Sequence, residues 1–87
     1  MSNVIFTRVG FNDYVYWQTQ DRKTLKKINN LLEDIQRNGA MQGIGKPEPL
    51  KYRQGYSRRI DDANRLIYDI DDRQNIKVIS CRGHYED

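Results

Sequence analysis

The sequence predicts an α+β domain of two layers, in which two N-terminal helices pack on a mostly antiparallel sheet. Three observations support this. Apolar residues recur at helical spacing through the first half of the chain, short alternating strands fill the second half, and one more strand precedes the helices. Because helices and strands are segregated along the chain, we expect the helices to cover one side of the sheet.

The chain begins with a strand and then turns helical. Residues 4–7, VIFT, are mostly β-branched or aromatic and predict the first strand. From Phe11 onward, Phe11, Tyr14 and Val15 follow helical spacing, and Tyr16 and Trp17 widen the apolar stripe. A first helix of about three turns is therefore expected here.

A second helix follows almost directly. Asp21 is a suitable N-cap, and Gly39 is a suitable C-terminal cap within the flexible segment 37–45. Between them, one helical face carries an unbroken apolar stripe made of Leu25, Ile28, Leu31, Leu32 and Ile35. Such a stripe predicts an amphipathic helix that packs on a core.

The second half of the chain predicts an antiparallel meander. Its strands are expected around Lys51 and Tyr52, and then at 56–60, 65–70 and 76–82. The turn between the second and third of these strands leaves two registers open. A loop of residues 61–63 places Arg59 opposite Arg65 on one face, whereas a loop one residue longer makes them diverge.

Length and composition indicate a single cytosolic domain, residues 1–87. A chain of 87 residues is too short for two folding units, and it has neither a membrane-spanning apolar run nor a signal-peptide stretch. Its one cysteine, Cys81, excludes an internal disulfide. Because Cys81 lies in an alternating apolar run, we expect a buried core residue rather than a reactive thiol.

Positive charge is concentrated in one segment. Within 46–59 there are five cations and one acid, Glu48, in a chain whose net charge is +3. The five cations are Lys46, Lys51, Arg53, Arg58 and Arg59. Such a basic patch suits a polyanionic partner such as a nucleic acid, although a solvated charged face explains the charge equally well.

Several residues that could carry chemistry lie in or after this segment. Glu48 stands between Pro47 and Pro49, which stiffen the backbone around the carboxylate, and His84 is the single histidine. Each has an ordinary interpretation as a solvated side chain. Together with Lys and Arg side chains they match the needs of RNA cleavage, namely a base for the 2′-OH, cations for the phosphorane and an acid for the leaving oxygen.

Five segments in a fixed order resemble a known family. They are DYVYWQTQDRKTLKKINNLLEDI, GIGKPEPLK, GYSRRID, NRLIYDI and CRGHY. Their order and spacing resemble those of the YoeB toxins, the endoribonuclease half of the YefM–YoeB toxin–antitoxin modules in the RelE superfamily. The resemblance implies a microbial RNase-like, RelE-like fold that enters the ribosomal A site and cuts the mRNA codon there, without a metal or other cofactor.

The resemblance also implies roles for matched residues. Glu48 would be the general base on the 2′-OH, His84 the general acid, and Arg65 the group that stabilises the phosphorane. An imidazole donates a proton readily near neutral pH, which suits the role of His84.

Three further residues would bind the substrate: Lys51 and Arg59 would hold the phosphate, and Tyr85 would orient or stack on the RNA. The chain departs from the family pattern at two places. Ala63 stands where some relatives have an acid, so the turn at 61–64 is left out of the predicted catalytic set. Residues 86–87 add two acids after Tyr85.

The implied partners are a YefM-like antitoxin, the ribosome with its mRNA and, through the antitoxin complex alone, operator DNA. A homodimer fits the family, and no membrane partner is expected. Two other functions stay open: a non-catalytic RNA- or DNA-binding module, and a co-repressor subunit without activity. The combination of a base, an acid and an arginine favours the enzyme, because phosphate binding alone does not require Glu48.

Overall fold

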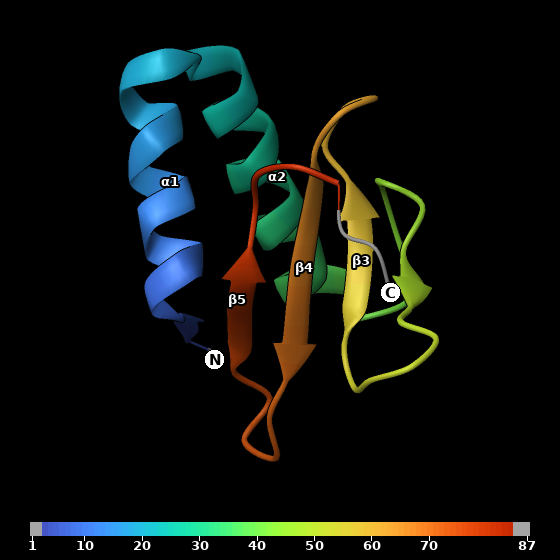
Figure 1. Ribbon diagram of the computed structural model, residues 1–87. Helices are drawn as coiled ribbons and strands as arrows, with labels where there is room; N and C mark the ends of the chain where they lie inside the picture. Colours follow the sequence, from blue (N-terminus) through green and yellow to red (C-terminus); the bar gives the residue numbers. More distant parts are fainter. Residues whose placement is uncertain (1–2, 85–87) are drawn as a thin grey trace.

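The computed structural model describes residues 3–84 as a five-stranded sheet with two helices (Figure 1). The elements are β1 (Val4–Phe6), α1 (Arg8–Gln20), α2 (Arg22–Asn38), β2 (Glu48–Pro49), β3 (Tyr56–Arg59), β4 (Arg65–Ile70) and β5 (Ile76–Ser80). In space the strands follow the order β1-β5-β4-β3-β2. The helices run side by side near β5, and β2 and β3 lie at the far edge (Figure 1).

The predicted two-layer α+β fold is confirmed. Strands β2 to β5 pair in antiparallel fashion, while β1 pairs in parallel with β5 through Val4 opposite Ile76. Residues of both helices and alternate strand residues form one core, in which Trp17 and Ile28 join Tyr68 and Val78. This alternation leaves the opposite face of β2, β3 and β4 free for polar side chains.

Helix α1 differs from its prediction in its start and its buried face. It begins at Arg8, and Phe11 and Val15 are exposed to 53% and 41%. Its buried residues are Gly10 and Trp17. A Cβ on Gly10 would lie 2.3 Å from the carbonyl oxygen of Val78, so glycine allows the helix to approach β5 closely.

Helix α2 matches its prediction. Asp21 caps it by accepting a hydrogen bond from the Lys23 backbone N–H at 3.0 Å, and Gly39 follows as the C-cap. Ile28, Leu31, Leu32 and Ile35 are buried, and Leu25 is half-buried against the same core.

The strand expected around Lys51 and Tyr52 is wrong, because these residues form a bend. The strand in this region is Glu48–Pro49, three residues earlier. The last two residues of the stiff Pro-Glu-Pro triplet therefore form the edge of the sheet itself, and β2 joins β3 there through two residue pairs.

Arg58 is not part of the basic patch that its charge suggested. Its side chain is fully buried, and its Nη1 lies 2.5 Å from the Asp34 carboxylate of α2. It also donates hydrogen bonds to the Tyr68 hydroxyl and to backbone carbonyls at Gly39, Gln42 and Ile44. Because side chains alternate between the two faces along β3, Arg58 points toward the core. Its guanidinium there binds the segment that follows α2.

No helix within residues 3–84 is both long enough and apolar enough to cross a membrane. Cys81 is fully buried, as predicted, at the end of β5.

Candidate active site

The sheet face away from the core carries a row of functional side chains. Glu48 on β2 lies opposite Ser57 on β3, and Ser57 lies opposite Ile67 on β4. In the neighbouring row on the same face, Arg59 pairs with Arg65. Since paired residues and alternate residues along a strand share a face, Glu48 and Arg65 come to the same side of the sheet.

A cavity of about 280 Å³ opens on this face. It is lined by Glu48, Pro49, Leu50, Lys51, Ser57, Arg65, Ile67 and His84. It thus brings together the three predicted catalytic residues and Lys51, which come from three parts of the chain. Ser57 and Ile67 form its buried floor and were not predicted as site residues.

The backbone before Glu48 is held in a fixed turn. Gly45 and Lys46 both have positive φ angles, 81° and 50°, and this turn leads directly into Pro47. The Arg59 N–H donates a 2.6 Å hydrogen bond to the Gly45 carbonyl, which ties the turn to β3. The Glu48 carboxylate is therefore presented from a restrained edge rather than from a loose loop.

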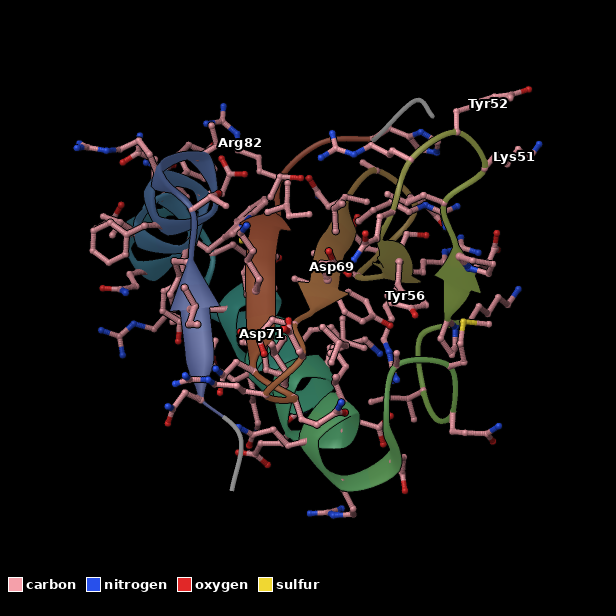
Figure 2. The ribbon with its side chains drawn as sticks, turned by 90° about the horizontal axis from the view of Figure 1, so that it is seen from below. Lys51, Tyr52, Tyr56, Asp69, Asp71 and Arg82 are labelled. Atoms are coloured by element: carbon pink, nitrogen blue, oxygen red, sulfur yellow. The ribbon has the colours of Figure 1, made fainter. Side chains whose placement is uncertain are left out.

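Lys51 comes from the loop that follows β2. Figure 2 shows Lys51 and Tyr52 on this loop, on the side of the sheet away from α2. Both are exposed, and Tyr52 retains 82% of its accessible surface. A cation here reaches the rim of the cavity, where a polyanion would approach.

The two arginines differ in their surroundings. The register with residues 61–63 as the loop is confirmed, because Ile60 pairs with Asn64 and Arg59 lies opposite Arg65. Arg65 lines the cavity and is half-buried. Arg59 forms an ion pair with Asp62 in the adjoining turn and is not among the lining residues.

The segment after β5, residues 81–84, is fastened to α1. The Trp17 indole N–H donates to the Cys81 carbonyl at 2.8 Å, and the Cys81 N–H donates to the Asp13 carboxylate at 3.0 Å. The Arg82 guanidinium stacks 3.7 Å above the Tyr16 ring. Tyr16 and Trp17 are therefore packing residues, and they hold the chain that leads to His84.

The next residue, Gly83, is held by the turn between β3 and β4. Its N–H donates to the Asn64 side-chain oxygen at 2.8 Å, and its carbonyl accepts from the Arg65 N–H at 3.0 Å. His84 follows directly and is exposed at the cavity. The role of Asn64 was missed, because nothing in a DDAN turn reveals that a distant segment binds it. Tyr85 lies outside the described residues.

Cys81 takes no part in this chemistry. Burial, followed by the nearby negative charge of Asp13, raises the pKa of the Cys81 thiol to about 12. A thiol with such a pKa stays protonated at neutral pH, and only the thiolate is a good nucleophile.

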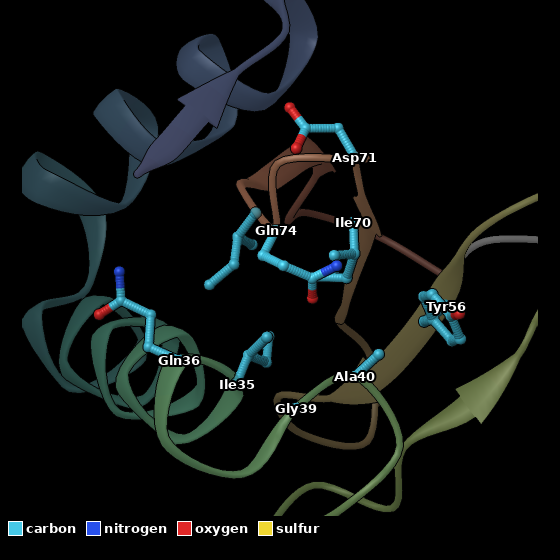
Figure 3. Close-up of a pocket in the computed structure, with 9 residues that line it drawn as sticks. Ile35, Gln36, Gly39, Ala40, Tyr56, Ile70, Asp71 and Gln74 are labelled. Carbon is cyan, nitrogen blue, oxygen red and sulfur yellow. The ribbon is translucent and has the colours of Figure 1, made fainter. Parts of the chain in front are cut away.

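A larger cavity of about 380 Å³ lies elsewhere, between the end of α2 and the turn after β4 (Figure 3). Asp71 is the one charged residue among the described residues that line it. Its carboxylate already accepts hydrogen bonds from the backbone N–H groups of Arg73 and Asn75. Size alone therefore does not identify the active site, and the cavity with Glu48, Arg65 and His84 is the better candidate.

The candidate site combines a carboxylate, a guanidinium and an imidazole. Such a set can remove a proton, stabilise a developing anion and supply a proton. Within residues 3–84, no three His, Cys, Asp or Glu side chains cluster in a way that could hold a metal ion. The carboxylate, guanidinium and imidazole suit general acid–base chemistry.

Comparisons with known proteins agree with one another. The model of the YoeB-like toxin of bacterial type II toxin–antitoxin systems matches residues 6–85. Toxin YoeB of Synechocystis sp. is 48% identical over 85 residues, covering 95% of this chain and 96% of the relative.

Two solved structures from Staphylococcus aureus share the fold. The YoeB dimer is 51% identical with a TM-score of 0.89, and the match covers 97% of this chain and 98% of the other. The YoeB–YefM complex gives 49% identity and a TM-score of 0.89, covering 98% of this chain and 99% of the other.

Proposed function

The chain belongs to the YoeB-like toxin family of bacterial type II toxin–antitoxin systems, and on this premise we propose that it is an endoribonuclease that cuts mRNA in the ribosomal A site. The observation that carries the proposal is the cavity shared by Glu48, Arg65 and His84. Side chains from β2, β4 and the segment after β5 converge there, although they are far apart in the sequence.

The proposed reaction is a transesterification followed by release of the downstream RNA. Glu48 removes the proton of the 2′-OH, and the 2′-oxygen attacks the adjacent phosphorus. Arg65 stabilises the charge on the five-coordinate phosphorane. The bond to the 5′-oxygen then breaks, and His84 donates a proton to that oxygen. The products are a 2′,3′-cyclic phosphate and a free 5′-OH.

Substrate binding is assigned to the cations around the cavity. Lys51 lines the rim, and Arg59 lies on the same face in the row beside Glu48. Both would contact phosphates of the mRNA, and Tyr85 would orient or stack on a base. Arg59 would have to exchange its Asp62 partner for phosphate, which is feasible for an exposed ion pair of low stability.

The proposed partners follow from the relatives. A YoeB–YefM complex and a YoeB dimer are known from Staphylococcus aureus. We infer that a YefM-like antitoxin inhibits this chain by covering its basic face with an acidic segment, and that a homodimer is a further assembly state. Contact with operator DNA would then pass through the antitoxin complex.

The decisive experiment incubates the purified protein with ribosomes carrying a defined mRNA and maps the new RNA ends. We expect cleavage in the A-site codon, with 2′,3′-cyclic phosphate and 5′-OH ends, and the same products in EDTA when polyamines keep the ribosomes intact. Products with 5′-phosphate ends would contradict the mechanism. RNA binding without cleavage would favour the non-catalytic binding module instead.

A further inference from the structure

Two turns of the sheet are built in the same way. Between β3 and β4, the Asp61 carboxylate accepts hydrogen bonds from the Asn64 backbone N–H at 2.7 Å and from its side-chain amide at 3.1 Å. Between β4 and β5, the Asp71 carboxylate accepts from the Asn75 N–H at 2.9 Å and from its side-chain amide at 3.1 Å. In both turns the aspartate fixes the orientation of the asparagine side chain.

Each asparagine then holds a separate segment of the chain through two hydrogen bonds. Asn64 accepts from the Gly83 N–H at 2.8 Å, while the Arg65 N–H donates to the Gly83 carbonyl at 3.0 Å. Asn75 accepts from the Asn3 N–H at 3.0 Å, while the Ile76 N–H donates to the Asn3 carbonyl at 2.8 Å. We call this arrangement an Asn clasp.

The two clasps differ in what they hold. The Asn75 clasp holds the residue before β1, and Asn75 lies in the turn at the other end of β4 from Arg65. The Asn64 clasp holds Gly83, the residue directly before His84, beside the cavity that His84 lines. One clasp thus fixes a strand end, and the other fixes the backbone of the residue directly before the proposed general acid.

Packing against the described residues does not hold Gly83. It is exposed, and a Cβ added to it would meet no atom of residues 3–84 within 4 Å. The contacts of α1 with this segment are made by Cys81 and Arg82. The backbone hydrogen bonds of the clasp are therefore the described attachment nearest to the imidazole.

We propose that Asn64 is a positioning residue for His84, acting through the Gly83 backbone with Asp61 as its support. The proposal rests on the proposed function, in which His84 protonates the leaving oxygen. Proton transfer requires the imidazole within hydrogen-bond reach of that oxygen, and a displacement of about 1 Å can cost about 10²-fold in rate.

The test compares Asn64→Ala with Asn75→Ala, which removes the same contacts from the other clasp. Single-turnover cleavage on programmed ribosomes, ribosome affinity and urea unfolding are measured for both. We expect Asn64→Ala to cleave roughly 10- to 100-fold more slowly at unchanged ribosome affinity. Asn75→Ala should lose similar stability and cleave at the parental rate. Equal rates in the two variants would overturn the proposal.

Two further variants separate positioning from a general structural role. In a His84→Gln background, Asn64→Ala should cause no additional loss of rate, because the group that it positions is already absent. The double variant Asp61→Asn with Asn64→Asp exchanges the two side chains. Position 64 then still offers an acceptor to the Gly83 N–H, and positions 61 and 64 still have a donor and an acceptor for each other. This double variant should regain most of the rate that Asn64→Asp alone loses, and failure to do so would count against the clasp.

Hydrogen exchange of the Gly83 amide provides a measurement that does not depend on activity. Asn64→Ala should accelerate this exchange, and Asn75→Ala should leave it unchanged. An unchanged exchange rate in Asn64→Ala would refute the clasp itself. A parental cleavage rate in His84→Gln would instead refute the proposed acid, whereas slow His84→Gln with fully active Asn64→Ala would refute only the positioning role.

Discussion

The partly exposed Asp34 carboxylate on α2 and the fully buried Arg58 guanidinium on β3 form an ion pair with 2.5 Å between Oδ2 and Nη1. The pair joins the helix layer to the sheet, and Arg58 also binds backbone carbonyls of the segment between α2 and β2. That segment leads to Glu48. The ion pair therefore links the core to the strand that presents the proposed base.

We predict that Asp34→Ala destabilises the protein strongly. The substitution leaves the Arg58 charge buried with only neutral partners, and loss of one member of a buried pair typically costs about 3–5 kcal/mol. The free energy of unfolding is obtained from urea denaturation followed by circular dichroism.

Asp62→Ala is the matched control for that experiment. It breaks the exposed ion pair with Arg59, in which Asp62 retains 94% of its side-chain accessibility. Exposed pairs contribute about 0–1 kcal/mol, so this variant should unfold close to the parental midpoint. A similar loss in both variants would show that the burial of Arg58 gives its pair with Asp34 no special effect on stability.

Stability should fall in acid, and Asp34 should account for part of the fall. Burial by itself raises the pKa of Asp34, but hydrogen bonds from Arg58, the Ile44 N–H and Asn38 outweigh it, and the pKa lies below the usual 3.8. Near pH 4 the unfolded chain thus binds protons that the folded chain does not. The stabilisation contributed by ionised Asp34 is therefore fully present above about pH 4. It is lost as the pH falls through the pKa that Asp34 has in the folded protein.

The measurement is the melting temperature from pH 7 to pH 2.5 for the parent and for Asp34→Asn. We expect a parental melting temperature that declines below about pH 4 and a weaker decline in the variant, which is less stable at pH 7. Parallel curves would exclude Asp34 as a source of the acid sensitivity.

Each proposed catalytic residue should affect the rate rather than binding or folding. Glu48→Gln and His84→Gln should slow single-turnover cleavage by about 10²–10⁴-fold, the usual contribution of acid–base catalysis. Arg65→Ala should lose about 10²–10³-fold, as for one preorganised contact to a developing charge. Ribosome affinity and melting temperature are measured on the same preparations. If His84→Gln loses affinity in step with rate, His84 is a docking residue, and Tyr85 becomes the first candidate for the acid.

Cys81 should resist alkylation while the protein is folded. Burial and the Asp13 carboxylate raise the pKa of its thiol to about 12, so the reactive thiolate is scarce at pH 8. Mass spectrometry after treatment with iodoacetamide should find unmodified protein in native buffer and one adduct in denaturant. Rapid labelling of the native protein would contradict the buried position.

The parts of the fold that depend on strong local patterns could be predicted from the sequence. Helix α2 was predictable from its apolar stripe and its two caps. Strand β4 was predictable from its alternating residues, and it has the predicted bounds, Arg65–Ile70. The predicted site residues Glu48, Arg65 and His84 meet at one cavity. Their roles in catalysis stay predictions that the rate measurements above will test.

Features that depend on distant contacts could not be predicted. The buried face of α1 is set by the approach of Gly10 to β5, which apolar spacing does not reveal. The sequence places Arg58 in the basic patch, and nothing in it reveals the ion pair with Asp34 on α2 that accompanies its burial. Asn64 resembled an ordinary turn residue, because the segment that it holds lies 19 positions further along the chain.

The strand order has a consequence for the synthesis of the protein. β1 is translated first, yet its hydrogen-bonding partner is β5, which is translated after every other strand. A nascent chain therefore leaves β1 unpaired and β4 with one neighbour until residues 76–80 have emerged, and contacts of such wide sequence separation form slowly. The cavity is lined by His84, which follows β5 in the chain. A growing chain therefore cannot assemble the cavity until that residue has emerged as well.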